Sequence, residues 1–483
     1  MSKPGELAAS PSKMKIDPAV MKVAWILLVG MLAPLFDTTI MNVAIDTLGN
    51  VLHAPVTSIQ WVMTSYLLAI SLVIPISGWL VDRYGGKNMW NLALSLFLVG
   101  SVLCGLSWNV GSLIAFRVIQ GLGGGLMMPI MQTMIVRAAG GQNLGRVMAI
   151  VGLPVLIGPI LGPVLGGVII HNLDWRWIFY VNIPVCLIAL FLSLKGLPKD
   201  DVANHPQKLD LLGLTLVSPA LVLMIYGLTK VSSEHGFFKS PVLVPIAIGL
   251  LFLIVFCWYV LRKTDHPIVD LRIFKSTTFS ASACLLFISG LSSYAGMLLL
   301  PLYYQQVRGH SVLASGLLLI PQGLGMLMTR SLAGKLTDTI GSRWVVLGGT
   351  ILTLLGTLPF AMSSVDTSEL MLAISLVVRG GGLGGLMLPI MATAYEGLSK
   401  ELVPHASSAT RILQQIGGAF GASVFAVILQ NQINSQPVHD VSTLNTAFNH
   451  TFMWSVVFTI VSLVFIIFLP HKKKNTVLKP SIN

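Results

Sequence analysis

Long apolar segments dominate this sequence and decide what kind of fold it can adopt. A helix that crosses a lipid bilayer needs about 20 mostly apolar residues, and only 10% of the residues are charged, far fewer than in soluble domains. Fourteen segments qualify: 21–44, 58–80, 89–107, 111–136, 145–170, 177–195, 209–229, 240–261, 279–303, 312–334, 344–362, 369–394, 406–430 and 450–469. The sequence therefore predicts an all-α polytopic membrane protein with 14 transmembrane helices.

The basic residues orient these helices. If the N-terminus is cytoplasmic, the inward loops and tails hold 22 of the 30 Lys and Arg, the outward loops hold four, and four lie within spans. This bias follows the positive-inside rule and places both termini in the cytoplasm, which requires an even number of helices. Short outward loops and the Lys472–Lys474 cluster, which suits anionic inner-leaflet lipid, favour a bacterial plasma (inner) membrane.

Two pairs of similar segments recur at nearly equal offsets. Gly78–Lys87 and Gly334–Arg343 share Gly, Leu, Asp, Gly and a basic residue at the same spacing, and Arg117–Met131 resembles Arg379–Met391. Both copies keep the same orientation, so we interpret the halves as parallel repeats related by an axis along the membrane normal, with chance similarity of Gly-rich helices as the alternative. The predicted domains are an N-terminal six-helix bundle with a cytoplasmic tail (1–208), two inserted helices (209–262) and a C-terminal six-helix bundle with a basic cytoplasmic tail (263–483).

Five motifs together carry a family resemblance: Asp37–Ala44, Gly78–Lys87, Arg117–Gly121, Gly158–Gly167 and Trp175–Pro184. With them the sequence resembles the fourteen-helix drug:proton antiporters (EmrB/QacA type) of the major facilitator superfamily over nearly its whole length. The resemblance implies the major facilitator fold and proton-coupled efflux of amphipathic, often cationic, compounds by rocker-switch alternating access. Export of a lipid or an endogenous metabolite with the same fold and coupling is the alternative, and solute import by symport is disfavoured by the Gly158–Gly167 motif.

Asp37 is the only acid clearly within a predicted span, where an Asp costs about 2.5–3.5 kcal/mol at a helix centre. We interpret it as the proton-coupling residue; the alternative is a structural carboxylate bonded to Thr38, Thr39 or a neighbouring helix. Arg117 is the buried cation of the same half, and the resemblance implies that it lies with Gln120 near the central cavity and influences protonation. A purely structural or snorkelling arginine is the alternative. If Asp37 and Arg117 pair permanently, the proton site must lie elsewhere.

The loop after the second span combines a short glycine turn with charge. A carboxylate such as Asp82 is stabilised at the N-terminus of a neighbouring helix, and the resemblance implies a cytoplasmic latch that holds the outward-facing state. A solvated basic loop is the alternative. The latch residues are Gly78, Asp82, Arg83, Gly85 and Lys87, with Asp338 in the C-terminal copy.

Small residues line one face of the fifth predicted span. Gly158, Gly162 and Gly166 recur every four residues, which permits close approach of another helix. With Pro163 and Gly167, they resemble the antiporter motif at the interface of the two halves. The alternative is that these residues serve only close packing between helices.

An apolar cavity with scattered amides is expected between the halves. The candidate lining residues are Asn42, Trp61, Tyr66, Gln120, Met128, Gln132, Gln322, Gln414 and Phe420. Side chains of these types also face lipid or other helices in most membrane proteins. Arg379 and Arg411 lack obvious acidic partners, and they either attract anionic groups or bond to carbonyl groups; the sequence leaves both roles open.

Other function classes find little support in the sequence. No G-x-x-x-x-G-K-[ST] motif is present, which argues against an ATP-driven pump. All ten His residues lie in loops or at span ends, which argues against an enzyme with intramembrane metal or acid–base chemistry. We therefore expect no cofactor and no metal, a proton gradient as the energy source, and small amphipathic substrates, protons and membrane lipids as partners. Nucleic acid is not expected as a partner, and the monomer is expected to be the functional unit.

Overall fold

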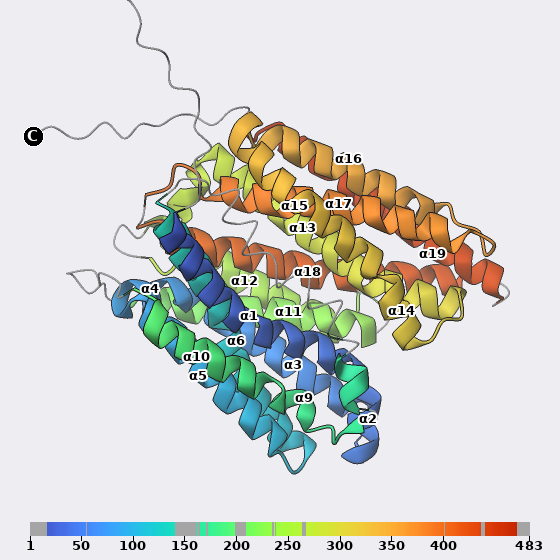
Figure 1. The fold of residues 1–483 in the computed structure, drawn as a ribbon, viewed down its shortest axis with the longest axis horizontal. Coiled ribbons are helices and arrows are strands. Elements are labelled where there is room, and N and C mark those ends of the chain that lie inside the picture. The colour runs from blue at the N-terminus through green and yellow to red at the C-terminus, as the bar shows by residue number, and fades with distance from the viewer. Residues whose placement is uncertain are drawn as a thin grey trace, which may run out of the picture.

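The computed structural model describes residues 17–54, 56–140, 162, 165–170, 172–198, 209–233, 236, 238–262, 267–399, 401–435 and 440–470. In these ranges the regular structure is helical and contains no strand (Figure 1). The predicted all-α class is therefore confirmed for the described part of the chain.

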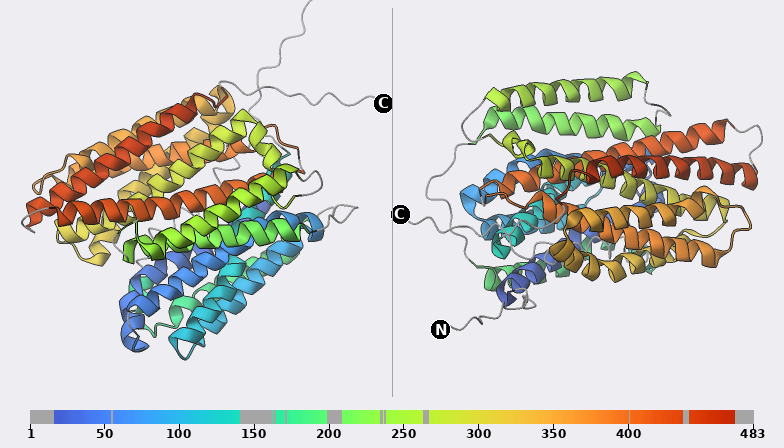
Figure 2. Two further views of the ribbon diagram at one scale, coloured as in Figure 1. Left: turned by 180° about the vertical axis from the view of Figure 1, so that it is seen from behind. Right: turned by 90° about the horizontal axis from the view of Figure 1, so that it is seen from above.

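The helices group into two bundles and a hairpin. The N-terminal half consists of α1 (Pro18–Val43), α2 (Ile45–Val51), α3 (Val56–Val73), η1 (Ile74–Ile76), α4 (Ser77–Tyr84), α5 (Gly86–Gly105), α6 (Val110–Ala139), α9 (Trp177–Tyr180) and α10 (Asn182–Gly196). The C-terminal half consists of η2 (Leu271–Lys275), α13 (Thr277–Leu302), η3 (Tyr303–Val307), α14 (Val312–Leu318), α15 (Ile320–Ile340), α16 (Ser342–Ala361), α17 (Glu369–Ala394), α18 (Val403–Asn434) and α19 (Val441–Ile466). Between them, α11 (Leu211–Ser233) and α12 (Ser240–Arg262) form a hairpin at one edge of the molecule (Figure 2).

Twelve helices in the described residues are long and apolar enough to cross a membrane. Each coincides with one of the predicted spans. The predicted span 312–334 is described as two helices, α14 and α15, which meet at Leu319, and polar residues such as Gln322 and Arg330 dilute its apolar character. The predicted span 145–170 lies largely outside the described residues. The structure thus supports twelve spans and does not confirm fourteen.

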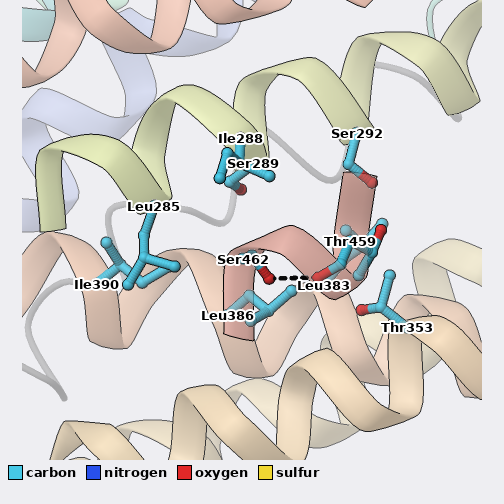
Figure 3. Close-up of a pocket in the computed structure, with 10 residues that line it drawn as sticks. All are labelled: Leu285, Ile288, Ser289, Ser292, Thr353, Leu383, Leu386, Ile390, Thr459 and Ser462. Atoms are coloured by element: carbon cyan, nitrogen blue, oxygen red, sulfur yellow. Dashed lines mark hydrogen bonds between the residues drawn. The ribbon is translucent and has the colours of Figure 1, made fainter. Parts of the chain in front are cut away.

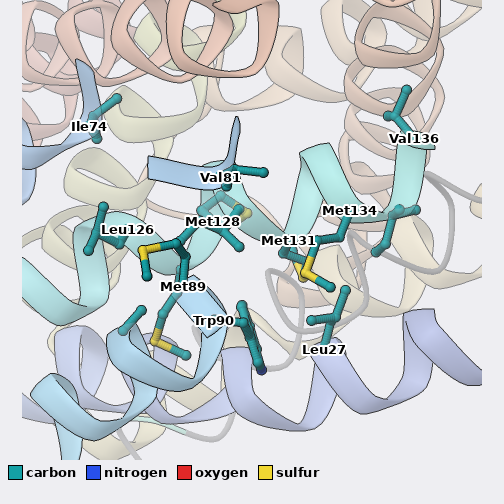
Figure 4. Close-up of a cluster of buried hydrophobic side chains, with 14 of the residues drawn as sticks. Leu27, Ile74, Val81, Met89, Trp90, Leu126, Met128, Met131, Met134 and Val136 are labelled. Atoms are coloured by element: carbon teal, nitrogen blue, oxygen red, sulfur yellow. The ribbon is translucent and has the colours of Figure 1, made fainter. Parts of the chain in front are cut away.

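The two halves share one apolar core at the end of the bundle that carries α4. There, Leu27, Trp90 and Met131 of the N-terminal half belong to the same buried cluster as Tyr395 and Ala406 of the C-terminal half. Figure 4 shows the N-terminal part of this cluster, where side chains of α1, α4, α5 and α6 converge. At this end the halves are packed together as one body.

At the opposite end each half has its own core. One cluster contains Met41 and Phe179 and draws on the N-terminal half. Another contains Tyr303, Phe360 and Phe452 and draws on the C-terminal half. Closely packed interiors move as units, so the structure is closed at the α4 end and joins the halves less firmly at the other.

Glycine contacts fix how the two repeats correspond. A Cβ built on Gly100 would lie 2.6 Å from the backbone of Gln120, and one built on Gly356 would lie 2.3 Å from the backbone of Arg379. Gly100 and Gly356 occupy the same position in the helices that follow the two repeated motifs, α5 and α16. The equivalent of Gln120 in the second half is therefore Arg379. Matching the two arginines by sequence, which paired Arg379 with Arg117, is wrong.

A second pair of contacts agrees with this register. The built Cβ of Gly121 faces the carbonyl oxygen of Tyr66 at 2.7 Å, and that of Gly380 faces the carbonyl oxygen of Gln322 at 1.9 Å. Arg117 thus corresponds to Leu376. The motif match failed because a Gly-rich helix can align in several ways by sequence, whereas close backbone contacts permit only one.

We expect Gly356→Ala to destabilise the C-terminal half by about 1–3 kcal/mol, because the added methyl group would collide with backbone rather than with a flexible side chain. Gly348 on the same helix is the matched control, since a Cβ there meets nothing within 4 Å. Gly348→Ala should be neutral or slightly stabilising because Ala favours helix. Thermal unfolding in detergent checks both variants, and equal midpoints for the two would contradict the packing argument.

Candidate functional site

A buried ion pair lies inside the N-terminal half. Arg117 Nη1 of α6 lies 2.5 Å from Asp37 Oδ2 of α1, and the two side chains are 1% and 0% exposed. Removing two charges from water is unfavourable unless further hydrogen bonds satisfy them. The surroundings of the pair supply those bonds.

Two amide side chains complete the site. Asp37 Oδ1 accepts hydrogen bonds from Gln120 Nε2 at 2.8 Å and from Asn182 Nδ2 at 3.3 Å. Gln120 in turn accepts from Arg117 at 2.6 Å and donates to Ser101 Oγ at 2.8 Å. Every described polar contact of the carboxylate is with a donor, which is the arrangement that suits an ionised carboxylate.

The neighbouring threonines do not take part in this network. Thr38 donates to the carbonyls of Pro34 and Leu35, and Thr39 donates to those of Leu35 and Phe36. Both hydroxyls thus bond to their own helix. The alternative in which they hold Asp37 finds no support in the described contacts.

Spare hydrogen-bonding capacity borders the ion pair. The ring of Tyr66 on α3 stacks on the Arg117 guanidinium, whose Cζ lies 4.0 Å from the ring centroid. The buried Tyr66 hydroxyl and the buried Asn182 Oδ1 have no hydrogen-bond partner among the residues that the structure describes. Unsatisfied buried polar atoms are uncommon and call for an explanation. They supply partners that the network could use after a rearrangement.

We expect Arg117→Met to destabilise the protein by about 3–5 kcal/mol, because it leaves the Asp37 charge buried and unpaired. The double variant Asp37→Asn with Arg117→Met removes both charges and should recover most of the lost stability. Asp174→Asn, which breaks the exposed pair with Arg176, is the control and should have little effect. Thermal midpoints in detergent measure the series, and no recovery in the double variant would contradict the argument.

Hydrogen bonds join the two halves at the α4 end. The hydroxyls of Ser77 on η1–α4 and Ser408 on α18 are 3.0 Å apart, and Ser407 donates to the carbonyl of Pro129 on α6 at 2.9 Å. Tyr395 donates to Gln132 Oε1 at 3.1 Å. These contacts form a seam, by which we mean Ser77, Pro129 and Gln132 against Tyr395, Ser407 and Ser408.

The predicted latch residues lie beside this seam. Asp82 pairs with Arg137 at 2.6 Å, a partner that the sequence did not suggest. The expected helix N-terminus is nearby, because the built Cβ of Gly78 would lie 3.2 Å from Pro404 in the first turn of α18. The loop is therefore more than a solvated basic turn, since it contacts the opposite half.

The remaining latch residues, Arg83, Gly85, Lys87 and Asp338, each have different surroundings. Gly85 has φ +81°, a conformation that favours glycine. Lys87 Nζ donates to the carbonyls of Leu194 and Leu197 at the end of α10, at 2.9 and 2.8 Å. The Arg83 guanidinium lies beside the Trp79 ring, and Asp338 is half-buried near the end of α15.

The candidate cavity residues of the N-terminal half lie in different places. Trp61 stacks on Tyr226 of α11, at the junction with the inserted hairpin, and Gln132 belongs to the seam. Met128 is packed in the shared core. The side chain of Asn42 lies outside what the structure describes. Tyr66 and Gln120 adjoin the ion pair, so this half offers no single group of cavity residues.

The candidates of the C-terminal half lie near two arginines. Gln322 accepts from Arg379 Nη1 at 2.5 Å, and Gln414 accepts from Arg411 Nη1 at 3.2 Å. Phe420 packs against Phe287 with ring centroids 6.1 Å apart. The substrate-binding role of all these residues stays a prediction.

Part of the predicted glycine stripe is described, and it packs against α1. The built Cβ of Gly162 would lie 1.9 Å from Thr39 Oγ1, and that of Gly166 would lie 3.3 Å from Ile40. A Cβ on Gly167 would meet none of the described residues within 4 Å, and Gly158 and Pro163 lie outside the described residues. The stripe therefore allows close approach within the N-terminal half, two residues from Asp37.

A small cavity lies within the C-terminal half, between α13, α16, α17 and α19 (Figure 3). Its volume is about 20 Å³, enough for a water molecule but far below the roughly 300–1,000 Å³ of a drug-sized pocket. It is lined by Leu285, Ile288, Ser289, Ser292, Thr353, Leu383, Leu386, Ile390, Thr459 and Ser462. In the described residues there is no group of three or more His, Cys, Asp or Glu that could hold a metal.

Sequence reasoning missed two members of the ion-pair network, Asn182 and Ser101. Asn182 opens α10 within an otherwise apolar segment, and a buried amide of this kind usually has a polar partner. That signal was available, but it could not identify Asp37 as the partner.

Comparisons with known proteins agree with this architecture. The sequence model of the Major Facilitator Superfamily matches residues 26–422. The chain is 34% identical to "Multidrug resistance protein B homolog" of Mycobacterium tuberculosis, covering 88% of this chain and 79% of that protein. It is 28% identical to "Lincomycin resistance protein LmrB" of Listeria innocua, covering 91% and 94%.

Solved structures show the same fold. The human organic anion transporter MFSD10 (TETRAN) superposes with a TM-score of 0.66 at 15% identity, covering 93% of this chain and 100% of that one. A double tryptophan mutant of XylE superposes with a TM-score of 0.69 at 16% identity, covering 95% and 97%. The chain is a multi-pass membrane transporter rather than an enzyme, and it belongs to the Major Facilitator Superfamily.

Proposed function

We propose that this chain is a proton-coupled multidrug efflux antiporter of the fourteen-helix EmrB/QacA type, which exports amphipathic compounds across a bacterial plasma membrane. The single observation that carries the proposal is the buried Asp37–Arg117 pair with its amide partners. The names of the relatives from Mycobacterium and Listeria support the drug-efflux part. The proposed fourteen spans are the twelve apolar helices, α15, and the segment 145–170.

The network suggests how a proton could drive transport. In this structure three N–H groups hold Asp37 as a carboxylate that is fully buried. Three of the roughly four acceptor sites of the carboxylate are occupied, and a protonated Asp37 would lose its ionic attraction to Arg117 and hold it less strongly. Proton binding and rearrangement of the N-terminal half are then linked, as reciprocal coupling between two sites requires.

The arrangement of the apolar cores suggests which conformational state of the transport cycle the structure represents. With both termini cytoplasmic, the shared core and the seam close the cytoplasmic end, and the separate cores lie at the outer end. This corresponds to an outward-facing member of an alternating-access cycle. Release of a substrate outward and uptake of a proton by Asp37 are the steps that follow from this state.

Ethidium efflux from cells that express the protein, with and without an uncoupler, tests the proposal. We expect efflux that is faster than in cells without the protein and that stops when the uncoupler is added. If neither ethidium nor other amphipathic dyes are exported, drug efflux is overturned, and export of a lipid or an endogenous metabolite becomes the proposal. Efflux that persists with the uncoupler would remove proton coupling.

A further inference from the structure

The predicted spans contain more arginines than acids that could pair with them. They hold four arginines, and the one mid-span acid, Asp37, is bound to Arg117. Arg330, Arg379 and Arg411 form no ion pair with an acid in the part of the chain that the structure describes. Residues 141–171 contain no Asp or Glu, so the largely undescribed span cannot supply a carboxylate either.

Arg411 lies where the two halves face each other. It is one helical turn from Ser407, whose hydroxyl bonds to the Pro129 carbonyl of the N-terminal half. Residues four apart share a helix face, so Arg411 continues the seam towards the membrane centre. It is half-buried, and the described hydrogen bond of its guanidinium goes to Gln414 of its own helix.

The N-terminal half contributes the hydroxyl of Tyr66. Tyr66 is 1% exposed, and its hydroxyl has no hydrogen-bond partner in the described part of the chain. A Cβ built on Gly124 would lie 2.9 Å from this hydroxyl, which places it beside the middle of α6. Gly124 lies on the same helix as Pro129, whose carbonyl accepts from Ser407, and Arg411 is one helical turn from Ser407. An arginine without an acidic partner and a tyrosine hydroxyl without a hydrogen-bond partner among the described residues thus lie on packed helices of the two halves.

Arg379 on α17 adds a further positive charge in the C-terminal half. Its guanidinium occupies the space of a side chain on Gly296, with Nη2 2.3 Å from the built Cβ. Its described partners are neutral oxygens, Gln322 Oε1 and the Ser292 carbonyl. A passage lined by one sign of charge with apolar walls concentrates the opposite charge.

We propose that Arg411 and Tyr66 bind an anionic group of the substrate, so that the transporter prefers amphiphiles that carry a carboxylate, sulfonate or phosphate. The guanidinium offers planar paired donors that match such groups, and the Tyr66 hydroxyl donates from the other half. An organic cation meets repulsion from Arg411. The inference rests on the proposed efflux function and ranks its amphipathic substrates: anions and zwitterions bind more tightly than cations such as ethidium.

A pair of dyes that share one ring system tests the proposal. Anilinonaphthalene sulfonate carries an anionic group, and its parent phenylnaphthylamine does not. Binding is measured by equilibrium dialysis of the purified protein in nanodiscs against empty nanodiscs. We expect the sulfonate to bind the unmodified protein about tenfold or more tightly than the parent amine, the size of effect of a charged hydrogen-bonded contact.

The variants identify the residues responsible. Arg411→Gln should weaken sulfonate binding about tenfold or more and leave the parent amine unchanged, and Tyr66→Phe should weaken the sulfonate less. Arg411→Glu should reverse the preference in favour of ethidium, an outcome that a merely structural arginine does not predict. Arg411→Lys keeps the charge and serves if Arg411→Gln fails to fold. Arg262→Gln, at the exposed end of α12, is the control.

Two results separate this inference from the proposed function. Equal binding of the two dyes by the unmodified protein, or sulfonate binding unaffected by Arg411→Gln and Arg411→Glu, overturns the inference whatever the efflux assay shows. Arg411-dependent sulfonate binding together with absent efflux of every dye overturns drug efflux and leaves the anion site standing, because binding needs no proton gradient.

Discussion

Asp37→Asn is expected to reduce uncoupler-sensitive efflux to the level of cells without the protein. The asparagine amide keeps the size of the side chain and still accepts a hydrogen bond through its oxygen, but it cannot exchange a proton. Asp37 is the acid at the centre of the buried network, where Arg117, Gln120 and Asn182 all donate to it. Without a proton-binding group there, substrate movement has no link to the gradient.

The measurement is the initial rate of ethidium efflux from energised cells, normalised to the amount of protein in the membrane. Asp174→Asn is the matched control, since it makes the same chemical change at an acid that is 53% exposed, and it should transport normally. A thermal midpoint close to that of the unmodified protein shows that Asp37→Asn has folded. Full uncoupler-sensitive efflux in a folded Asp37→Asn protein would remove Asp37 from the coupling mechanism.

A disulfide across the seam is expected to stop transport completely. The hydroxyls of Ser77 and Ser408 are 3.0 Å apart and come from different halves, so cysteines at both positions lie close enough to form a disulfide with small adjustments. A covalent bond there holds the α4 end closed. Because alternating access requires this end to open, the oxidised protein should not transport, and a reductant should restore the rate.

The experiment needs a background without reactive thiols, so the four native cysteines, Cys104, Cys186, Cys257 and Cys284, are replaced first. Ser408→Cys alone is the control and should be insensitive to oxidant. The readout is efflux before oxidation, after oxidation with copper phenanthroline, and after reduction. A fully cross-linked protein that transports at the unmodified rate would show that the seam stays closed throughout the cycle, and rocking of the halves would have to be abandoned.

Several features of the fold were predictable because they depend on local composition. Apolar segment length locates a span whatever its neighbours are, and twelve predicted spans appear as long apolar helices. Among the predicted spans that the structure describes, 312–334 is the exception, because polar residues such as Gln322 and the buried Arg330 dilute its apolar character. The apolar runs 209–229 and 240–261 likewise predicted the spans that appear as α11 and α12.

The candidate site was predictable in part. An acid and an arginine in apolar helices of one half can be recognised as candidate site residues because burying a charge is unfavourable. The structure brings these two residues, Asp37 and Arg117, together. Their amide partners could not be assigned, because Asn182 lies 145 residues from Asp37 along the chain. Gln132 was an expected cavity residue, yet it bonds to Tyr395 and belongs to the seam.

The sequence by itself determined that this protein lies in a membrane, that two pairs of similar segments recur along it, and that Asp37 is the acid within a predicted span, since each follows from residue type and spacing along the chain. Only the tertiary structure decided which side chains meet. It paired Asp82 with Arg137, matched Arg379 with Gln120, and left Arg411 without an acid in the described part of the chain. The reason is physical: contacts between helices depend on their rotation and depth, which close packing of glycines and side chains sets once the whole bundle has assembled.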